Sequence, residues 1–162
     1  MTEPNRMGFT RARDLLAVAG VALVLGYLLT RLSYQRLPPL PRFAGVPAAL
    51  LGIGEAVAGY GLRSRIRQRG GSASGAVPAK PVAPLTAARA VMTAKATSLA
   101  GAALIGLWAG LLVYVVPSWS LLAAAREDGI TGIIGLVGAV IMTAGGLFLE
   151  YCCRVPDADR SG

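Results

Sequence analysis

Residues 96–116 read ATSLAGAALIGLWAGLLVYVV, an apolar run without a charged side chain. Because an α-helix rises about 1.5 Å per residue, a helix of this length spans the roughly 30 Å of hydrocarbon in a bilayer. Lys95 stands before the run, and Pro117 and Trp119 stand after it. Trp is enriched at the headgroup level of membranes. The stretch therefore predicts a transmembrane helix.

Three further apolar runs have the same character. They cover residues 15–32 (LLAVAGVALVLGYLLTRL), 43–62 (FAGVPAALLGIGEAVAGYGL) and 129–149. Each is long enough to cross a bilayer as a helix. Basic residues precede the first run, but no small-residue cleavage site follows it, which favours an uncleaved signal anchor. We therefore expect an all-α integral membrane protein with four transmembrane helices.

The composition supports a membrane protein and removes most catalytic chemistry. Hydrophobic residues make up 54% of the chain and charged residues 15%, and the mean hydropathy is +0.59. A soluble domain has about a quarter of its residues charged. The chain has no histidine, and Cys152 and Cys153 are adjacent, so most triads, zinc sites and spaced disulfide frameworks are excluded. We expect no enzyme activity, no cofactor and no metal.

The basic residues predict the orientation. The net charge is +8, but Lys and Arg cluster between the apolar runs, which is typical of topology signals and argues against nucleic-acid binding. Twelve of them lie on one side of the four predicted helices and four on the other, so both termini are expected in the cytoplasm of a cell membrane. The four arginines between residues 63 and 69 are expected to contact anionic headgroups. The expected segments are a cytoplasmic N-terminal segment (1–14), helices 1 and 2 (15–62), a flexible basic cytoplasmic loop (63–84), helices 3 and 4 (85–151) and a cytoplasmic tail (152–162).

Four stretches carry a family resemblance. They are TRARDLL (10–16), GEAVAGYGLRSRI (54–66), AARAVMTAKATSLAGAALIGLWAG (87–110) and FLEYCCRVP (148–156). With them the chain resembles an actinobacterial family of four-helix membrane proteins catalogued as domain of unknown function 3180. The resemblance covers nearly the whole chain from Met7 onward, where the Met-x-x-Thr-Arg start of that family would fall. It implies the four-helix architecture and no established activity.

Small residues recur at helical spacing inside three of the runs. In lipid, apolar side chains gain little by associating, so helices pack through small residues that let their backbones approach. We expect the small-residue stripes to face one another in the bundle. The expected packing residues are Gly52 and Gly59 in the second run, Ala102, Gly106 and Gly110 in the third, and Gly135 in the fourth.

Glu55 is the carboxylate inside the second run. An ionisable group in the membrane costs about 2.5 kcal/mol or more at the centre and usually faces the bundle interior. Thr97, Ser98 and Thr143 fall at similar depths, with Lys95 close by, so we expect an intramembrane polar cluster of these five residues. Lys95 and Glu55 lean in opposite directions along the membrane normal, which argues against a direct ion pair between them. We expect Glu55 to make structural hydrogen bonds rather than to couple protons or a substrate.

Three functions are compatible with these features. The first is a non-catalytic structural or partner-binding membrane component, with another membrane protein or a second copy as its partner. The alternative is a small oligomeric transporter that uses Glu55 as its coupling carboxylate. A membrane enzyme ranks last, because the acidic residues in or near the helices are few and lie at different ends.

Overall fold

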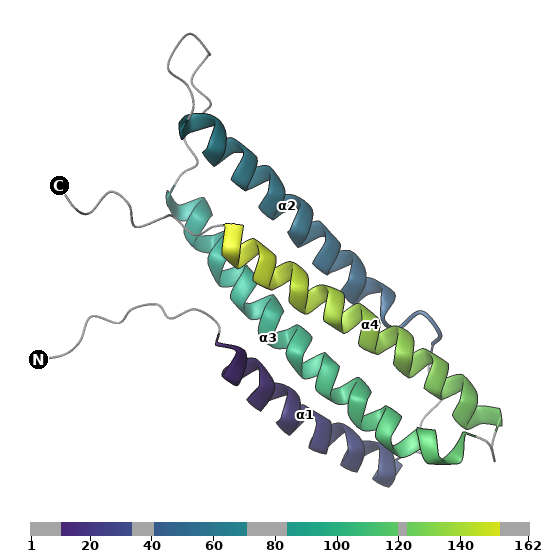
Figure 1. Ribbon diagram of the computed structural model, residues 1–162. Helices are drawn as coiled ribbons and strands as arrows, with labels where there is room; N and C mark the ends of the chain where they lie inside the picture. The colour runs from purple at the N-terminus through teal and green to yellow at the C-terminus, as the bar shows by residue number, and fades with distance from the viewer. Residues whose placement is uncertain (1–10, 34–40, 71–83, 120–122, 153–162) are drawn as a thin grey trace, which may run out of the picture.

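The described part of the protein is a row of four long helices (Figure 1). The computed structural model describes residues 11–33, 41–70, 84–119 and 123–152, the side chains of 62–70, 84–88 and 123–124 excepted. Over these residues it contains no strand, so the expected all-α class is confirmed. The helices are α1 (Ala12–Ser33), α2 (Val46–Gly70), α3 (Pro84–Val115) and α4 (Ala123–Cys152), with the short 3₁₀ helix η2 (Val116–Ser118) after α3.

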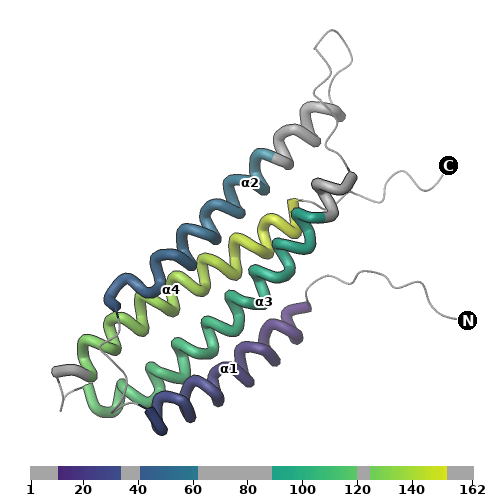
Figure 2. The backbone as a smooth tube through the Cα atoms, turned by 180° about the vertical axis from the view of Figure 1, so that it is seen from behind, coloured from purple at the N-terminus to yellow at the C-terminus, as the bar shows by residue number. Residues whose placement is uncertain are grey.

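The spatial order of the helices differs from their order in the chain. Figures 1 and 2 show the helices side by side in the order α1, α3, α4, α2. Accordingly α1 packs against α3, α3 against α4, and α2 against α4, and among the described residues no other pair of these four helices has more than marginal contact. The two edge helices therefore each have one extensive helical neighbour, while α3 and α4 have two.

The contacts also give the direction of each pair. A side chain added at Gly106 would meet Ala22, and one at Gly110 would meet Tyr27, so α1 and α3 run in the same direction. The central pair α3 and α4 is antiparallel, because Gly101 lies against Thr143 while Trp108 lies against Gly135. The edge helix α2 runs parallel to α4, as the glycine contacts below show.

Within the described residues, three helices are long and apolar enough to cross a membrane. They are Ala12–Ser33, Arg89–Ser118 and Ala125–Cys152, whereas the apolar part of α2 is the shorter stretch Val46–Gly61. All four helices expose large apolar side chains, for example Leu29 and Leu50 on the two edge helices. The second predicted run, residues 43–62, thus forms the first part of α2, which begins at Val46 and continues to Gly70 through the arginine-rich stretch.

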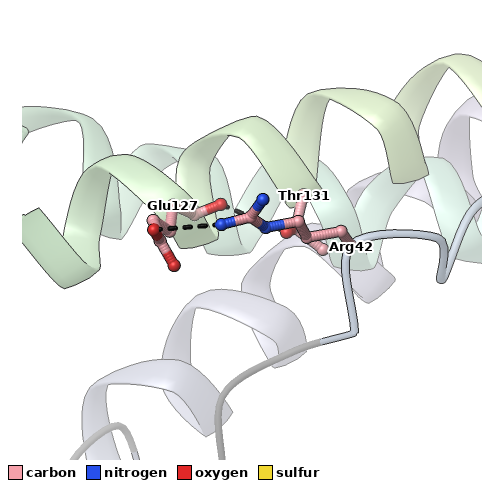
Figure 3. Close-up of polar contacts among 3 residues, drawn as sticks. All are labelled: Arg42, Glu127 and Thr131. Atoms are coloured by element: carbon pink, nitrogen blue, oxygen red, sulfur yellow. Dashed lines mark hydrogen bonds and ion pairs between the residues drawn. The ribbon is translucent and has the colours of Figure 1, made fainter.

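An ion pair connects the beginnings of α2 and α4. Figure 3 shows Arg42, four residues before α2, pointing toward Glu127 in the first turns of α4. The Arg42 guanidinium donates to a Glu127 carboxylate oxygen at 3.1 Å, and both side chains are about two-thirds exposed. The Thr131 hydroxyl donates to the backbone carbonyl of Glu127, one turn back. The pair therefore lies exposed at the end of the α2–α4 contact where both helices begin.

Candidate functional site

The contact between α2 and α4, here called the α2–α4 seam, is built from glycines seven residues apart. Side chains added at Gly138 and Gly145 would collide with the backbones of Gly45 and Gly52. A methyl group at Gly52 would lie 2.5 Å from the Met142 Cα atom. Since Gly45 faces Gly138 and Gly52 faces Gly145, the two helices are parallel. A seven-residue repeat keeps one face of a helix against its neighbour, as in coiled coils.

A second glycine contact joins α1 and α3. A methyl group at Gly110 would lie 2.6 Å from the Tyr27 backbone nitrogen, and one at Gly106 would lie 2.7 Å from the Ala22 Cβ atom. Gly26 in turn lies against the backbone of Leu107. Gly106 and Gly110 of the predicted stripe on the third run thus face α1, while Gly52 and Gly59 of the second run face α4. The small-residue stripes are divided between two separate contacts.

The antiparallel contact between α3 and α4 holds Gly135, another of the predicted packing residues. The Trp108 ring covers Gly135, and Gly146 lies against Ser98, whose backbone nitrogen would be 3.0 Å from an added methyl group. Ala102 is buried, with 2% of its surface exposed. Here a large aromatic side chain fills the space above one glycine, so this contact is less uniform than the α2–α4 seam.

Glu55 is buried beside the α2–α4 seam, and one of its carboxylate oxygens has no hydrogen-bond donor among the described residues. It lies three residues after Gly52 and four before Gly59. A methyl group added at Gly59 would lie 3.3 Å from the Leu149 Cα atom. Only 9% of the Glu55 surface is exposed, and its Oε2 atom is buried with no hydrogen-bond partner among the described residues. A buried polar atom without a partner is costly and uncommon in folded proteins. Glu55 is therefore the leading candidate for a functional residue.

The predicted hydroxyl partners of Glu55 bond elsewhere. The Ser98 hydroxyl donates to the Lys95 carbonyl at 3.0 Å, and the Thr143 hydroxyl donates to the Ala139 carbonyl at 2.8 Å. Serine and threonine in helices commonly bond backwards to their own backbone in this way. Thr97 is buried, at 7% exposure, and Lys95 is half-buried. The structure gathers Ser98 and Thr143 at the α3–α4 contact and shows no hydrogen bond from either hydroxyl to Glu55.

Helix register places three charged residues at one depth. Continuing the pairing of Gly52 with Gly145 brings Glu55 level with Phe148 on α4. Continuing the antiparallel pairing of Ser98 with Gly146 brings Lys95 level with the same turn, which also contains the buried Glu150. Glu55, Lys95 and Glu150 thus share one layer on three helices.

Glu150 was not included in the predicted cluster. Its position directly after the fourth apolar run indicates a boundary residue, and only the burial of the last turn of α4 reveals it as part of the layer.

The described part of the chain holds no group of three or more metal-ligating side chains, and Cys152 is a buried free thiol. What the layer offers chemically is one unpartnered carboxylate oxygen inside an apolar helix array. Such an oxygen can accept a hydrogen bond or exchange a proton.

Fold and site together define a class, that of all-helical membrane proteins with an ionisable layer inside the helix array. Within it, the chain belongs to the family described as protein of unknown function (DUF3180), which matches residues 15–157. No curated protein and no solved structure matches the chain.

Proposed function

We propose that the protein is a non-catalytic component of the cell membrane that crosses the bilayer four times and binds a partner within it. The observation that carries this proposal is the open row of helices, in which α1 and α2 each pack on one neighbour and expose apolar faces. Helices in lipid associate through close backbone approach and buried polar contacts. An edge helix with a buried, unpartnered Glu55 offers both.

The proposed orientation places both termini and the arginine-rich end of α2 in the cytoplasm. The twelve-to-four division of basic residues supports it through the positive-inside rule. In this orientation Glu55, Lys95 and Glu150 lie near the cytoplasmic side, close to the anionic headgroups that the arginines would contact. Within the described residues the apolar stretch of α2, Val46–Gly61, is short for a full crossing, and a bilayer accommodates such a stretch by thinning locally.

Photocrosslinking in native membranes tests partner binding. A photoreactive residue would replace Leu50 on α2 or Leu25 on α1, both more than half exposed, and Ala139, which is fully buried, would serve as the control position. We expect the photoreactive residue on at least one edge helix to form a crosslink to another protein molecule. At position 139 we expect no crosslink to another protein molecule. Lipid adducts alone at both edge positions would contradict a partner-binding role.

A second candidate function is a small oligomeric transporter with Glu55 as the coupling carboxylate, and the unpartnered Oε2 atom is the observation that favours it. An amide cannot exchange a proton, so Glu55→Gln would remove coupling. In liposomes with a pH gradient, a pH-sensitive dye should then show proton flux with the wild-type protein and only the flux of empty liposomes with the variant. Equal fluxes in all three would exclude proton movement through Glu55 in the absence of a co-substrate.

A further inference from the structure

We propose that Glu55 of α2 and Thr97 of α3 hold a sodium ion between them, at the corner that these two helices form over α4. This inference rests on the second candidate function and names the ion at its coupling carboxylate.

The row of helices is bent at α4. Gly145 lies against the backbone of α2, whereas Gly146, the next residue, lies against α3. Likewise Gly138 lies against α2 and Gly135 against α3. At about 100° per residue, the directions from α4 to α2 and from α4 to α3 therefore differ by only about 60 to 100°. The helices α2 and α3 thus form a corner over α4.

Glu55 projects from α2 on the side of this corner. Seen along α4 from its N-terminal end, α3 lies clockwise from α2, because α-helices are right-handed and Gly146 follows Gly145. On the parallel helix α2, the side nearer α3 is therefore turned counterclockwise from the residues that face α4. Glu55 is turned by about 60° from Gly52 in that direction. Its side chain thus leaves α2 between α4 and α3.

Thr97 projects into the same corner from α3. Gly101 lies against Thr143 of α4, and Ser98 also faces α4. In the same view, each step back along the antiparallel helix α3 turns clockwise, which is the direction of α2. Thr97 is turned in this direction by about 40° from Gly101 and by about 100° from Ser98.

The two side chains lie at one depth, and both are buried. The glycine pairings place Glu55 level with Phe148 of α4 and Thr97 level with Leu147. Glu55 is 9% exposed and Thr97 is 7% exposed. The Oε2 atom of Glu55 is buried with no hydrogen-bond partner in the described chain. An unpartnered carboxylate oxygen thus faces a corner that also holds a buried hydroxyl group from a different helix.

The other charged residues of this depth are turned away from the corner. Lys95 leaves α3 about 160° from Thr97. Glu150 leaves α4 about 140° from Gly145, which faces α2. A charge in apolar surroundings is costly unless an opposite charge accompanies it. A small cation at the corner would supply that charge to the Glu55 carboxylate.

The oxygen atoms of the corner favour a hard monovalent cation. One carboxylate balances one positive charge, and hard cations bind proteins through oxygen atoms. A proton needs only the carboxylate, whereas a metal ion also uses neutral oxygen ligands such as the hydroxyl of Thr97. Ionisable residues inside membranes commonly mark the paths of ions. Sodium, a small monovalent cation, suits a site between closely packed helices.

Thermal unfolding in detergent tests the site, with sodium chloride replacing choline chloride at constant ionic strength. We expect the wild-type melting temperature to rise by several degrees in sodium, because an ion that binds only the folded protein stabilises it. Glu55→Gln should abolish this rise and Thr97→Val should reduce it. The matched control is Thr131→Val, at a buried threonine near the other end of α4, and it should keep the full rise. Equal melting temperatures of the wild type in the two salts would overturn the proposal.

The same measurement separates binding from folding. Without sodium, the Glu55→Gln protein should be at least as stable as the wild type, because the substitution removes a buried charge that lacks compensation. A variant that unfolds at a normal temperature and no longer responds to sodium has lost the ion and kept the fold. A Glu55→Gln protein that retains the full sodium response would show that the ion binds elsewhere.

Carboxyl labelling identifies the ion. The hydrophobic reagent N,N′-dicyclohexylcarbodiimide modifies protonated carboxyl groups within membranes, and mass spectrometry of the digested protein locates the label. We expect sodium to slow the labelling of Glu55 severalfold relative to choline and to leave the labelling of Glu150 unchanged. Labelling of Glu55 at equal rates in both salts would show that its ligand is a proton alone and would reject the sodium site.

The outcomes also separate this inference from the second candidate function. A sodium-dependent melting temperature without ion flux in liposomes would leave the site in place and reject transport. Proton flux that requires Glu55, without a sodium effect on melting or labelling, would keep transport and reject the sodium site.

Discussion

At the scale of single residues, Glu55 is buried at a cost that the described fold does not compensate. Its Oε2 atom has no donor, and the nearby Ser98 and Thr143 hydroxyls are satisfied within their own helices. A residue that costs stability without serving packing is typical of functional sites.

Replacing Glu55 by leucine should therefore stabilise the isolated monomer. Because neither the Ser98 nor the Thr143 hydroxyl bonds Glu55, Glu55→Leu removes a buried unsatisfied atom without leaving these groups unpaired, and we expect the free energy of unfolding in detergent to rise by about 1 kcal/mol. Glu55→Gln should change it less, since the amide is still polar. A lower melting temperature for the leucine variant would show that Glu55 has a structural donor.

Gly106 should be among the least tolerant positions of the membrane-spanning helices. A side chain there collides with the backbone of Ala19, so Gly106→Leu must separate α3 from α1, at a cost of about 2 kcal/mol. Thermal unfolding of detergent-purified protein measures this loss. The same substitution at Gly20, which faces open space, is the control, and equal losses at both positions would mean that α1 and α3 are not in close contact.

At the scale of helices, the α2–α4 seam requires residues without a side chain at Gly138 and Gly145 of α4. Gly145→Ala places a methyl group against the Gly52 carbonyl and should destabilise the contact. Gly129→Ala places its methyl group 3.6 Å from the Trp119 ring, an ordinary van der Waals distance, and should be neutral or stabilising because alanine favours helices. Chemical denaturation in detergent distinguishes the two. The seam would have to be discarded if Gly145→Ala were the more stable of the pair.

The ion pair at the beginning of α2 should contribute little. Arg42 and Glu127 are 69% and 67% exposed, and water and salt screen such pairs. Arg42→Ala is therefore expected to lower the free energy of unfolding by less than about 1 kcal/mol, and 1 M salt should remove most of the difference from the wild type. A large, salt-independent loss would show that Arg42 also packs against the bundle.

The sequence predicts where helices form much better than it predicts which helices contact one another. Apolar length and the proline and charged boundaries indicate four helical runs because these signals are local. A glycine stripe, by contrast, indicates that another helix packs closely on one face, but it does not indicate which helix this is. Thus Gly106 and Gly52 carry the same signal, yet one lies against α1 and the other against α4. The partners of the Ser98 and Thr143 hydroxyls are hard to predict for a related reason, since a backward bond to the helix backbone competes with any distant acceptor such as Glu55.

At the scale of the whole molecule, the row of helices and the basic segments define one topology that reporter fusions can test. Fusions at Gly75 and at the C-terminus should report the cytoplasm, and a fusion at Pro39 should report the outside, because twelve of the sixteen basic residues lie on the first side. An outside signal from the Gly75 fusion would reverse the proposed orientation. If the fusions at Pro39 and Gly75 both report the cytoplasm, α2, which lies between them, does not cross the membrane.

The order α1, α3, α4, α2 also constrains how the polypeptide assembles during synthesis. The two helices made first have no extensive contact with each other, and each gains its neighbour from the second half of the chain. In the proposed four-crossing topology, a ribosome that has released only the first 83 residues has delivered two helices into lipid that do not yet have their neighbours. The hairpin of α3 and α4 must then insert between α1 and α2. Until α4 emerges, the first half of the chain remains unassembled and accessible to quality-control proteases.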